Sequence, residues 1–205
     1  PSPATVSACC SLSTLLVTGA GLFAQSLLNL RTLGPGFDTS QIVTFALDAT
    51  LSGHAREAAR QLYRTLGDRL AALPGVTASS FASEAVLIGN VSARTVQVQG
   101  YQAQQSEDLN PWTNEIGPGY FAALGIPVLA GREFSARDID GAPRVAVINE
   151  TFAKYFFGSE NPIGQHVRMG PNPSGPWSTV VGVIGDIRHA GLEAEPAPEL
   201  YVNYL

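Results

Sequence analysis

Histidines are the residues of this sequence best suited to metal binding or proton transfer, and there are three of them: His54, His166 and His189. Metal sites usually draw their ligands from histidines and cysteines that stand a few residues apart. None of these histidines has another histidine or a cysteine within five residues. The sequence therefore predicts no metal site.

Two near pairs of carboxylates have the spacing of a general acid and base: Asp138 with Asp140, and Glu193 with Glu195. Catalysis by such a pair needs burial or a neighbouring charge that shifts one pKa. Both pairs stand among Gly, Ala and Pro residues, which are typical of exposed loops. We therefore expect solvated surface acids.

One mixed cluster remains, formed by Asp186, Arg188 and His189 after a hydrophobic segment. A turn that satisfies its own backbone explains this cluster as well as a functional site does. The sequence has no P-loop, no G-x-S-x-G elbow and no G-x-G-x-x-G fingerprint after a predicted strand. We expect no catalytic, cofactor-binding or metal-binding residues, and an enzyme is an alternative that rests on these loop side chains alone.

Composition and charge indicate a globular chain that does not bind nucleic acid. Of its 205 residues 45% are hydrophobic and 14% are charged, and the net charge is −5. Lys154 is the single lysine, whereas phosphate binding needs clustered Lys and Arg. The two cysteines, Cys9 and Cys10, are adjacent and provide no disulfide framework.

The elements that would position any site begin with an uncharged stretch, residues 1–30, which ends at Arg31. Residues 12–30 form a helix of roughly 28 Å at about 1.5 Å per residue, close to the ~30 Å hydrocarbon core of a bilayer. We therefore predict a transmembrane helix with its flank over 1–33, with lipid around residues 12–30. A signal peptide would need a basic start, which is lacking, and a buried helix of a soluble core is the other alternative.

Small residues within this predicted helix favour packing against other membrane helices. Their short side chains let neighbouring backbones approach closely. They are Gly19, Ala20, Gly21 and Ala24. Polar residues between them, such as Thr18 and Gln25, also suit a bundle better than a lone anchor.

Periodicity then predicts a strand–helix–strand crossover. Apolar residues alternate over 43–51, which predicts a strand, and recur every three or four residues over 54–73, which predicts an amphipathic helix that Pro74 and Gly75 end. A second strand is predicted over 76–81. Arg56, Arg60 and Arg64 lie on the opposite face of the helix and are expected to be solvated.

The rest of the chain predicts short strands with two short helices, an α+β fold of mostly antiparallel strands. The predicted strands cover 94–101, 112–116, 126–129, 144–148, 165–169, 178–184 and 199–204. The predicted helices run over 118–124 and from a cap at Asn149 to Gly158. Tyr120, Phe121 and Leu124 of the first helix are expected to form either core or a protein interface.

Several segments, in this order, resemble the MacB-like periplasmic core domain of FtsX-like ABC transporter permeases, particularly duplicated orphan permeases that carry two such domains. The matching segments are LLVTGAGLFAQSLLNLRTLGPGFD (15–38), LAALPGV (70–76), GPGYFAALGIPVLAGREF (117–134), RVAVINETFAKYFFGSENPIGQHV (144–167) and VVGVIGDIRHAGL (180–192).

This resemblance implies a two-lobed extracytoplasmic domain behind the membrane helix. Residues 34–117 would be the first half of a porter-like βαβ lobe, and 118–205 a smaller inserted lobe of mixed α and β structure. In the family a second porter crossover and further membrane helices follow, so this chain resembles a fragment.

The resemblance also implies a non-catalytic function in the bacterial cytoplasmic membrane, with residues after about 34 on the periplasmic side. A separate cytoplasmic ABC ATPase would bind ATP, and this chain would transmit the resulting motion, for export or mechanotransmission. The expected partners are that ATPase, a second periplasmic domain or permease copy, and membrane lipid. A secreted or membrane-anchored periplasmic binding module is the alternative function.

Overall fold

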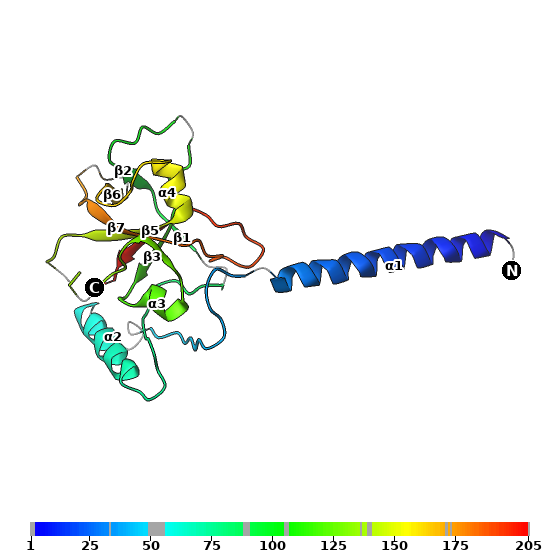
Figure 1. Ribbon diagram of the computed structural model, residues 1–205, viewed down its shortest axis with the longest axis horizontal. Helices are drawn as coiled ribbons and strands as arrows, with labels where there is room; N and C mark the ends of the chain where they lie inside the picture. Colours follow the sequence, from blue (N-terminus) through cyan, green and yellow to red (C-terminus); the bar gives the residue numbers. More distant parts are fainter. Residues whose placement is uncertain are drawn as a thin grey trace. The chain divides into compact units, whose positions relative to one another are not determined.

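The chain forms two compact units, Pro1–Gly34 and Pro35–Leu205, in the computed structural model of Figure 1. The structure describes residues 3–32, 34–48, 56–87, 91–104, 107–135, 137–138, 141–170, 172 and 174–204. Each unit is considered separately below.

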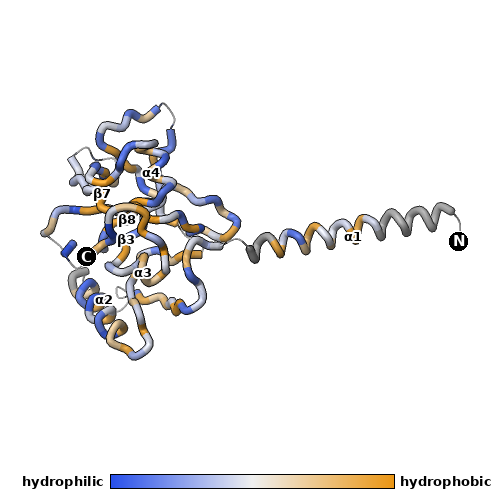
Figure 2. Tube along the Cα trace, in the orientation of Figure 1, coloured by the Kyte–Doolittle hydropathy of each residue, from blue (hydrophilic) through white to orange (hydrophobic). Residues whose placement is uncertain are grey.

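The first unit is one helix, α1 (Pro3–Thr32), of 30 residues. Every side chain described in it, over 14–28, is exposed, including the predicted packing residues Gly19, Ala20, Gly21 and Ala24. Short hydrophobic stretches are interrupted by less hydrophobic and hydrophilic residues along its described part (Figure 2). Among the residues that the structure describes, no helix combines the length and apolar character that a membrane span requires.

The second unit is built on one sheet whose strands are β1 (Ser92–Ala93), β2 (Val96–Val98), β3 (Trp112–Ile116), β4 (Val128–Gly131), β5 (Val145–Asn149), β6 (His166–Met169), β7 (Ser178–Ile184) and β8 (Glu199–Asn203). Their order is β1-β3-β8-β5-β7-β6-β2, and β4 pairs with β7. Because β1 and β2 are consecutive in the chain but lie at opposite ends of this order, the sheet curls back on itself.

Pairing in this sheet is mostly antiparallel, as predicted. The pairs β3–β8 and β5–β7 are parallel, and the other described pairs are antiparallel. The strands β1, β2 and β3 come from the first predicted lobe and share this sheet with strands of the second. The predicted lobe boundary at residue 117 thus falls immediately after a strand of a shared sheet.

Alternation along the strands divides the core between two faces of the sheet. In β5, Ala146 and Ile148 face a cluster that includes Phe152 and Phe156 of α4 (Glu150–Phe157). Val147 faces the other cluster, which includes α3 (Tyr120–Leu124). Successive strand residues point to opposite faces, so one helix covers each face.

Local signals correctly predicted the α4 helix. Asn149 accepts a hydrogen bond from the Phe152 amide at 2.9 Å, the interaction by which an N-cap satisfies an unpaired amide at the start of a helix. Gly158 follows its last residue. The predictions of β3 and β7 are also confirmed with the expected bounds, whereas β4 begins two residues later than predicted.

The predicted crossover at the start of this unit is wrong in its strands. Residues 43–48 form no strand, and 76–81 are also irregular, next to an isolated bridge between Ala82 and Ile116. Residues 49–51 lie outside the described part. Only the helix is confirmed, as α2 (Arg56–Ala71). The alternating pattern is real, but a strand also requires a neighbour for its backbone groups, which periodicity does not reveal.

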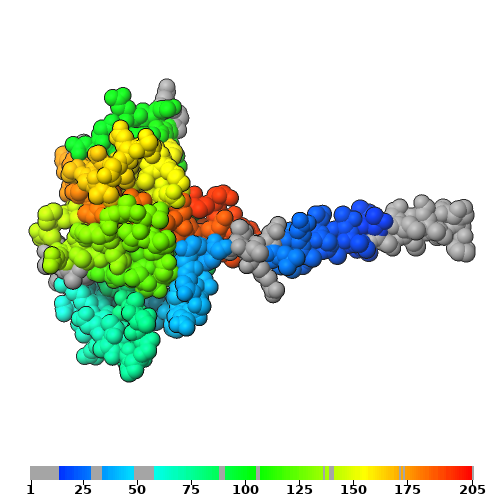
Figure 3. Space-filling view, viewed as in Figure 1, coloured from blue at the N-terminus to red at the C-terminus, as the bar shows by residue number. Residues whose placement is uncertain are grey.

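An aromatic contact holds α2 against the end of the chain. The ring centroid of Tyr63 lies 6.0 Å from that of Phe81 and 5.7 Å from that of Tyr204. The Tyr63 hydroxyl also donates a hydrogen bond to the Leu47 carbonyl at 3.0 Å. Residues 35–48 run over the surface of this unit, coloured light blue in Figure 3. The extended segment therefore contacts α2 through the Tyr63 hydrogen bond, although the segment pairs with no strand among the described residues.

Candidate functional site

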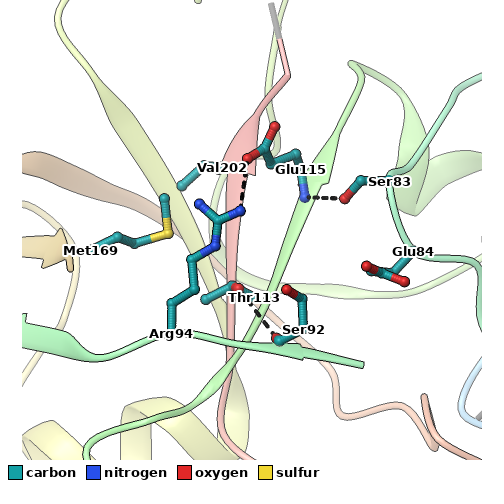
Figure 4. Close-up of a pocket in the computed structure, with 8 residues that line it drawn as sticks. All are labelled: Ser83, Glu84, Ser92, Arg94, Thr113, Glu115, Met169 and Val202. Carbon is teal, nitrogen blue, oxygen red and sulfur yellow. Dashed lines mark hydrogen bonds and ion pairs between the residues drawn. The ribbon is translucent and has the colours of Figure 1, made fainter. Parts of the chain in front are cut away.

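A pocket of about 210 Å³ lies over β1, β3 and β8 (Figure 4). It is lined by Ser83, Glu84, Ser92, Arg94, Thr113, Glu115, Met169 and Val202. Its volume is below the ~300 Å³ at which small-molecule sites usually begin.

Polar groups in this pocket bind one another. The Arg94 guanidinium lies 3.6 Å from the Glu115 carboxylate, and both side chains are substantially exposed. The Thr113 hydroxyl donates to the Ser92 carbonyl at 3.2 Å, and the Glu115 amide donates to the Ser83 hydroxyl at 3.2 Å. Exposed ion pairs of this kind contribute little to stability. The pocket presents a mixed polar surface and no convergent set of reactive groups.

A buried polar cluster lies next to β3 and at the start of β8. His189 is 3% exposed and Glu199 is 2% exposed, and the Nδ1 atom of His189 is 3.6 Å from a carboxylate oxygen of Glu199. The Tyr201 hydroxyl donates a hydrogen bond to that carboxylate. Burial, followed by the charge of Glu199, raises the pKa of the Tyr201 hydroxyl well above its ordinary value. Burial, followed by the charge of Glu199, also raises the pKa of the Tyr120 hydroxyl above its ordinary value.

A cavity of about 10 Å³ adjoins His189 and Glu199, beside Trp112 and Asn114. This is close to the minimum that one water molecule needs. Among the described residues, both ring nitrogens of His189 and one oxygen of Glu199 have no hydrogen-bond partner. Sequence reasoning missed Glu199 because it lies in a strand ten positions from His189, and no short-range pattern links the two.

The predicted cluster of Asp186, Arg188 and His189 does not converge on one site. The Asp186 carboxylate accepts hydrogen bonds from the Thr151 amide at 2.9 Å and the Thr151 hydroxyl at 2.7 Å. The Arg188 guanidinium donates to the Leu192 and Ala194 carbonyls. Asp186 therefore binds the start of α4, Arg188 binds the loop after it, and His189 lies in the buried cluster with Glu199.

The remaining titratable candidates also lie apart from one another. Asp138 is buried, Asp140 and His54 lie outside the described residues, and Glu193 and Glu195 are exposed. His166 is half-buried in β6. No group of three or more His, Cys, Asp or Glu side chains is arranged for metal binding in the described part of the chain.

Asp138 is a structural acid. Its carboxylate receives two hydrogen bonds from the Arg132 guanidinium, at 2.7 and 2.9 Å, and one from the Ser135 amide at 2.7 Å. These interactions, the Arg132 hydrogen bonds first, hold the pKa of the Asp138 carboxyl below its ordinary value. The side chain fixes the loop after β4.

We expect Asp138→Asn to destabilise the fold by about 2 kcal/mol at pH 7, a typical loss for a hydrogen-bonded charged group. Because the folded-state pKa is lowered, this contribution is present above the unfolded pKa of about 4 and is lost as the pH falls through the folded value. Urea unfolding of both proteins between pH 7 and pH 2.5 measures the difference. The exposed Glu193→Gln is the control, and a difference that does not shrink in acid would contradict this assignment.

Tyr120, Phe121 and Leu124 lie in the core on one face of the sheet. The Phe121 ring centroid lies 5.1 Å from that of Tyr201 in an edge-to-face contact and 5.6 Å from that of Tyr120. The short helix α3 therefore anchors the aromatic part of this core.

The chain belongs to the MacB-like periplasmic core domain family, which matches residues 8–204, and is thus a domain of an ABC transporter permease. It is 27% identical over 119 residues to the macrolide export ATP-binding/permease protein MacB of Aggregatibacter actinomycetemcomitans, covering 58% of this chain and 16% of that protein. The corresponding protein of Mannheimia succiniciproducens is 26% identical over 129 residues, which cover 63% of this chain and 17% of that protein.

The chain therefore spans about a sixth of the length of these curated relatives. Among solved structures, the periplasmic region of MacB from Actinobacillus actinomycetemcomitans is similar with a TM-score of 0.48 and 20% identity. That alignment covers 69% of this chain and 55% of the solved one.

Proposed function

We propose that this chain is a non-catalytic extracytoplasmic domain that transmits ATP-driven conformational change across the bacterial cytoplasmic membrane. The family match over residues 8–204 is the observation that carries this proposal. The named relatives are ATP-binding/permease proteins, in which nucleotide binding and the permease occur together. In such a system a ligand that binds one arrangement better than another shifts the equilibrium between them.

In this proposal ATP is bound by a separate cytoplasmic ABC ATPase, and this chain needs no cofactor of its own. A second periplasmic domain or a second permease copy completes the moving assembly, and the work serves export or mechanotransmission. Rigid-body motion of such domains requires a stable scaffold rather than reactive groups. The curled sheet with a core on both faces supports this role.

The helix α1 is proposed to be the membrane segment that leads into this domain. It has 30 residues, no charge before Arg31, and exposed apolar side chains such as Leu16 and Phe23. Its polar residues reduce its hydropathy, and neighbouring helices of the full-length permease would cover them, with Gly19, Ala20, Gly21 and Ala24 at the contact. Lipid would surround the rest of residues 12–30.

Cysteine labelling of the full-length permease tests this topology, after Cys9 and Cys10 are replaced by serine. We expect Glu195→Cys, at an exposed position, to react with a membrane-impermeant maleimide in intact cells. Ala24→Cys is expected to react only after denaturation, because lipid and neighbouring helices exclude the reagent. Reaction of Glu195→Cys only after cell lysis would contradict the extracytoplasmic placement.

Two further outcomes separate the functional alternatives. Mature protein that begins after about residue 24 and is recovered from the soluble periplasm would identify a secreted binding module instead. Transmission itself predicts that ATP changes the hydrogen exchange of residues 35–205 in the permease reconstituted with its ATPase. Exchange that is identical with and without ATP would contradict transmission while leaving the topology intact.

A further inference from the structure

A short turn after β7 contacts four separate parts of the second unit. This junction turn comprises residues 186–189. The Asp186 carboxylate binds the Thr151 amide and hydroxyl at the start of α4, at 2.9 and 2.7 Å. Ile187 is fully buried in the core beside α3. The turn is thus fixed by its side chains to two helices on opposite faces of the sheet.

The backbone of the junction turn makes the other two contacts. The Arg188 amide donates a hydrogen bond to the Pro35 carbonyl at 2.9 Å. The His189 carbonyl accepts a hydrogen bond from the Leu87 amide at 2.8 Å. Pro35 belongs to the segment 35–38, here called the connector, which begins three residues after the end of α1 at Thr32.

The connector packs so closely on the junction turn that one position admits only glycine. A Cβ atom at Gly36 would lie 2.4 Å from the Asp186 carbonyl oxygen and 2.9 Å from the Ile187 Cα atom. Gly36 also has a φ of +88°, which L side chains rarely adopt. The Asp38 amide donates to the Leu124 carbonyl at 2.8 Å, so the connector is held by α3 as well.

We propose that the junction turn makes the connector, the start of α4 and the segment 82–87 one cooperative unit. A displacement of the connector would then also shift α3 and α4, on the two faces of the sheet, through hydrogen bonds and a close backbone contact. This inference extends the proposed function by naming the route along which motion of the preceding helix enters the domain. It also assigns a role to Asp186 and the backbone of residues 188 and 189.

Amide hydrogen exchange on the 205-residue chain in detergent tests this coupling. In Gly36→Ala, we expect exchange to accelerate about tenfold or more at Arg188 and also at Thr151 and Leu87, because local opening exposes a cooperative unit together. Gly34→Ala is the matched control, since a Cβ there meets no atom within 4 Å. The Gln99 amide, bonded to the His166 carbonyl at 2.9 Å, reports on the distant part of the sheet and is expected to stay unchanged.

Acceleration at Arg188 alone would overturn the proposal, because the connector would then open without the other contacts. If Gly36→Ala unfolds the whole chain, Asp186→Asn tests the same unit from the α4 side, and it is expected to accelerate exchange at Arg188 as well as Thr151. An unchanged Arg188 amide in that variant would overturn the proposal. No ATP or ATPase is involved, so this result is independent of whether the domain transmits ATP-driven motion.

Discussion

Replacing Phe121 by alanine is expected to lower the free energy of unfolding by about 3–5 kcal/mol, the usual cost of removing a buried phenylalanine ring. Phe121 is fully buried and contacts both Tyr120 and Tyr201 through edge-to-face packing. The helix α3 that carries it packs in the core on one face of the sheet, and a close-packed core relaxes only partly around the space that the ring leaves. Urea unfolding followed by circular dichroism measures the loss.

Leu129→Ala is the matched control for this substitution, since Leu129 is 51% exposed and belongs to β4. Its expected effect is within about 0.5 kcal/mol. The same pair of variants separates the two roles considered for the α3 side chains. A Phe121→Ala chain that keeps its stability but no longer assembles with a second copy would show that the residue acts at an interface rather than in the core.

The second large effect is expected on the free energy of unfolding when Phe45 is replaced by serine, and it is expected only in the full-length permease. Val43, Phe45 and Leu47 are 88%, 63% and 46% exposed, and they alternate along an extended segment that forms no strand. An alternating apolar segment is typical of a strand with one buried face. We expect another segment of the full-length permease to pair with this segment and cover these side chains.

Phe45→Ser therefore has two expected outcomes. In the 205-residue chain it changes the free energy of unfolding by about 0.5 kcal/mol or less, because the ring is already exposed. In the full-length permease it costs about 2–3 kcal/mol, the value of burying such a side chain. Thr44→Ser, on the alternate face, is the control in both proteins. An equally small effect of Phe45→Ser in both proteins would contradict pairing of this segment in the full-length permease.

Sequence patterns determined those elements whose signals are local. The α4 helix has its cap at Asn149, its apolar side chains at helical spacing and Gly158 at its end within ten residues, and the structure has the same element. The strand β7 is a short run of β-branched residues, and its bounds are also as predicted. The energies that select these elements act between near neighbours, so one sequence suffices to find them.

Tertiary structure alone decided which segments meet. The β3 strand pairs in parallel with β8, which comes more than eighty residues later, and His189 meets Glu199 from a different element. The segment 43–48 has the pattern of a strand, but the described chain provides no neighbouring strand for it. Strand pairing and buried polar contacts depend on long-range chain placement, which hydrophobic periodicity does not encode. For the same reason Asp186 and Arg188, predicted as one cluster, serve separate parts of the fold.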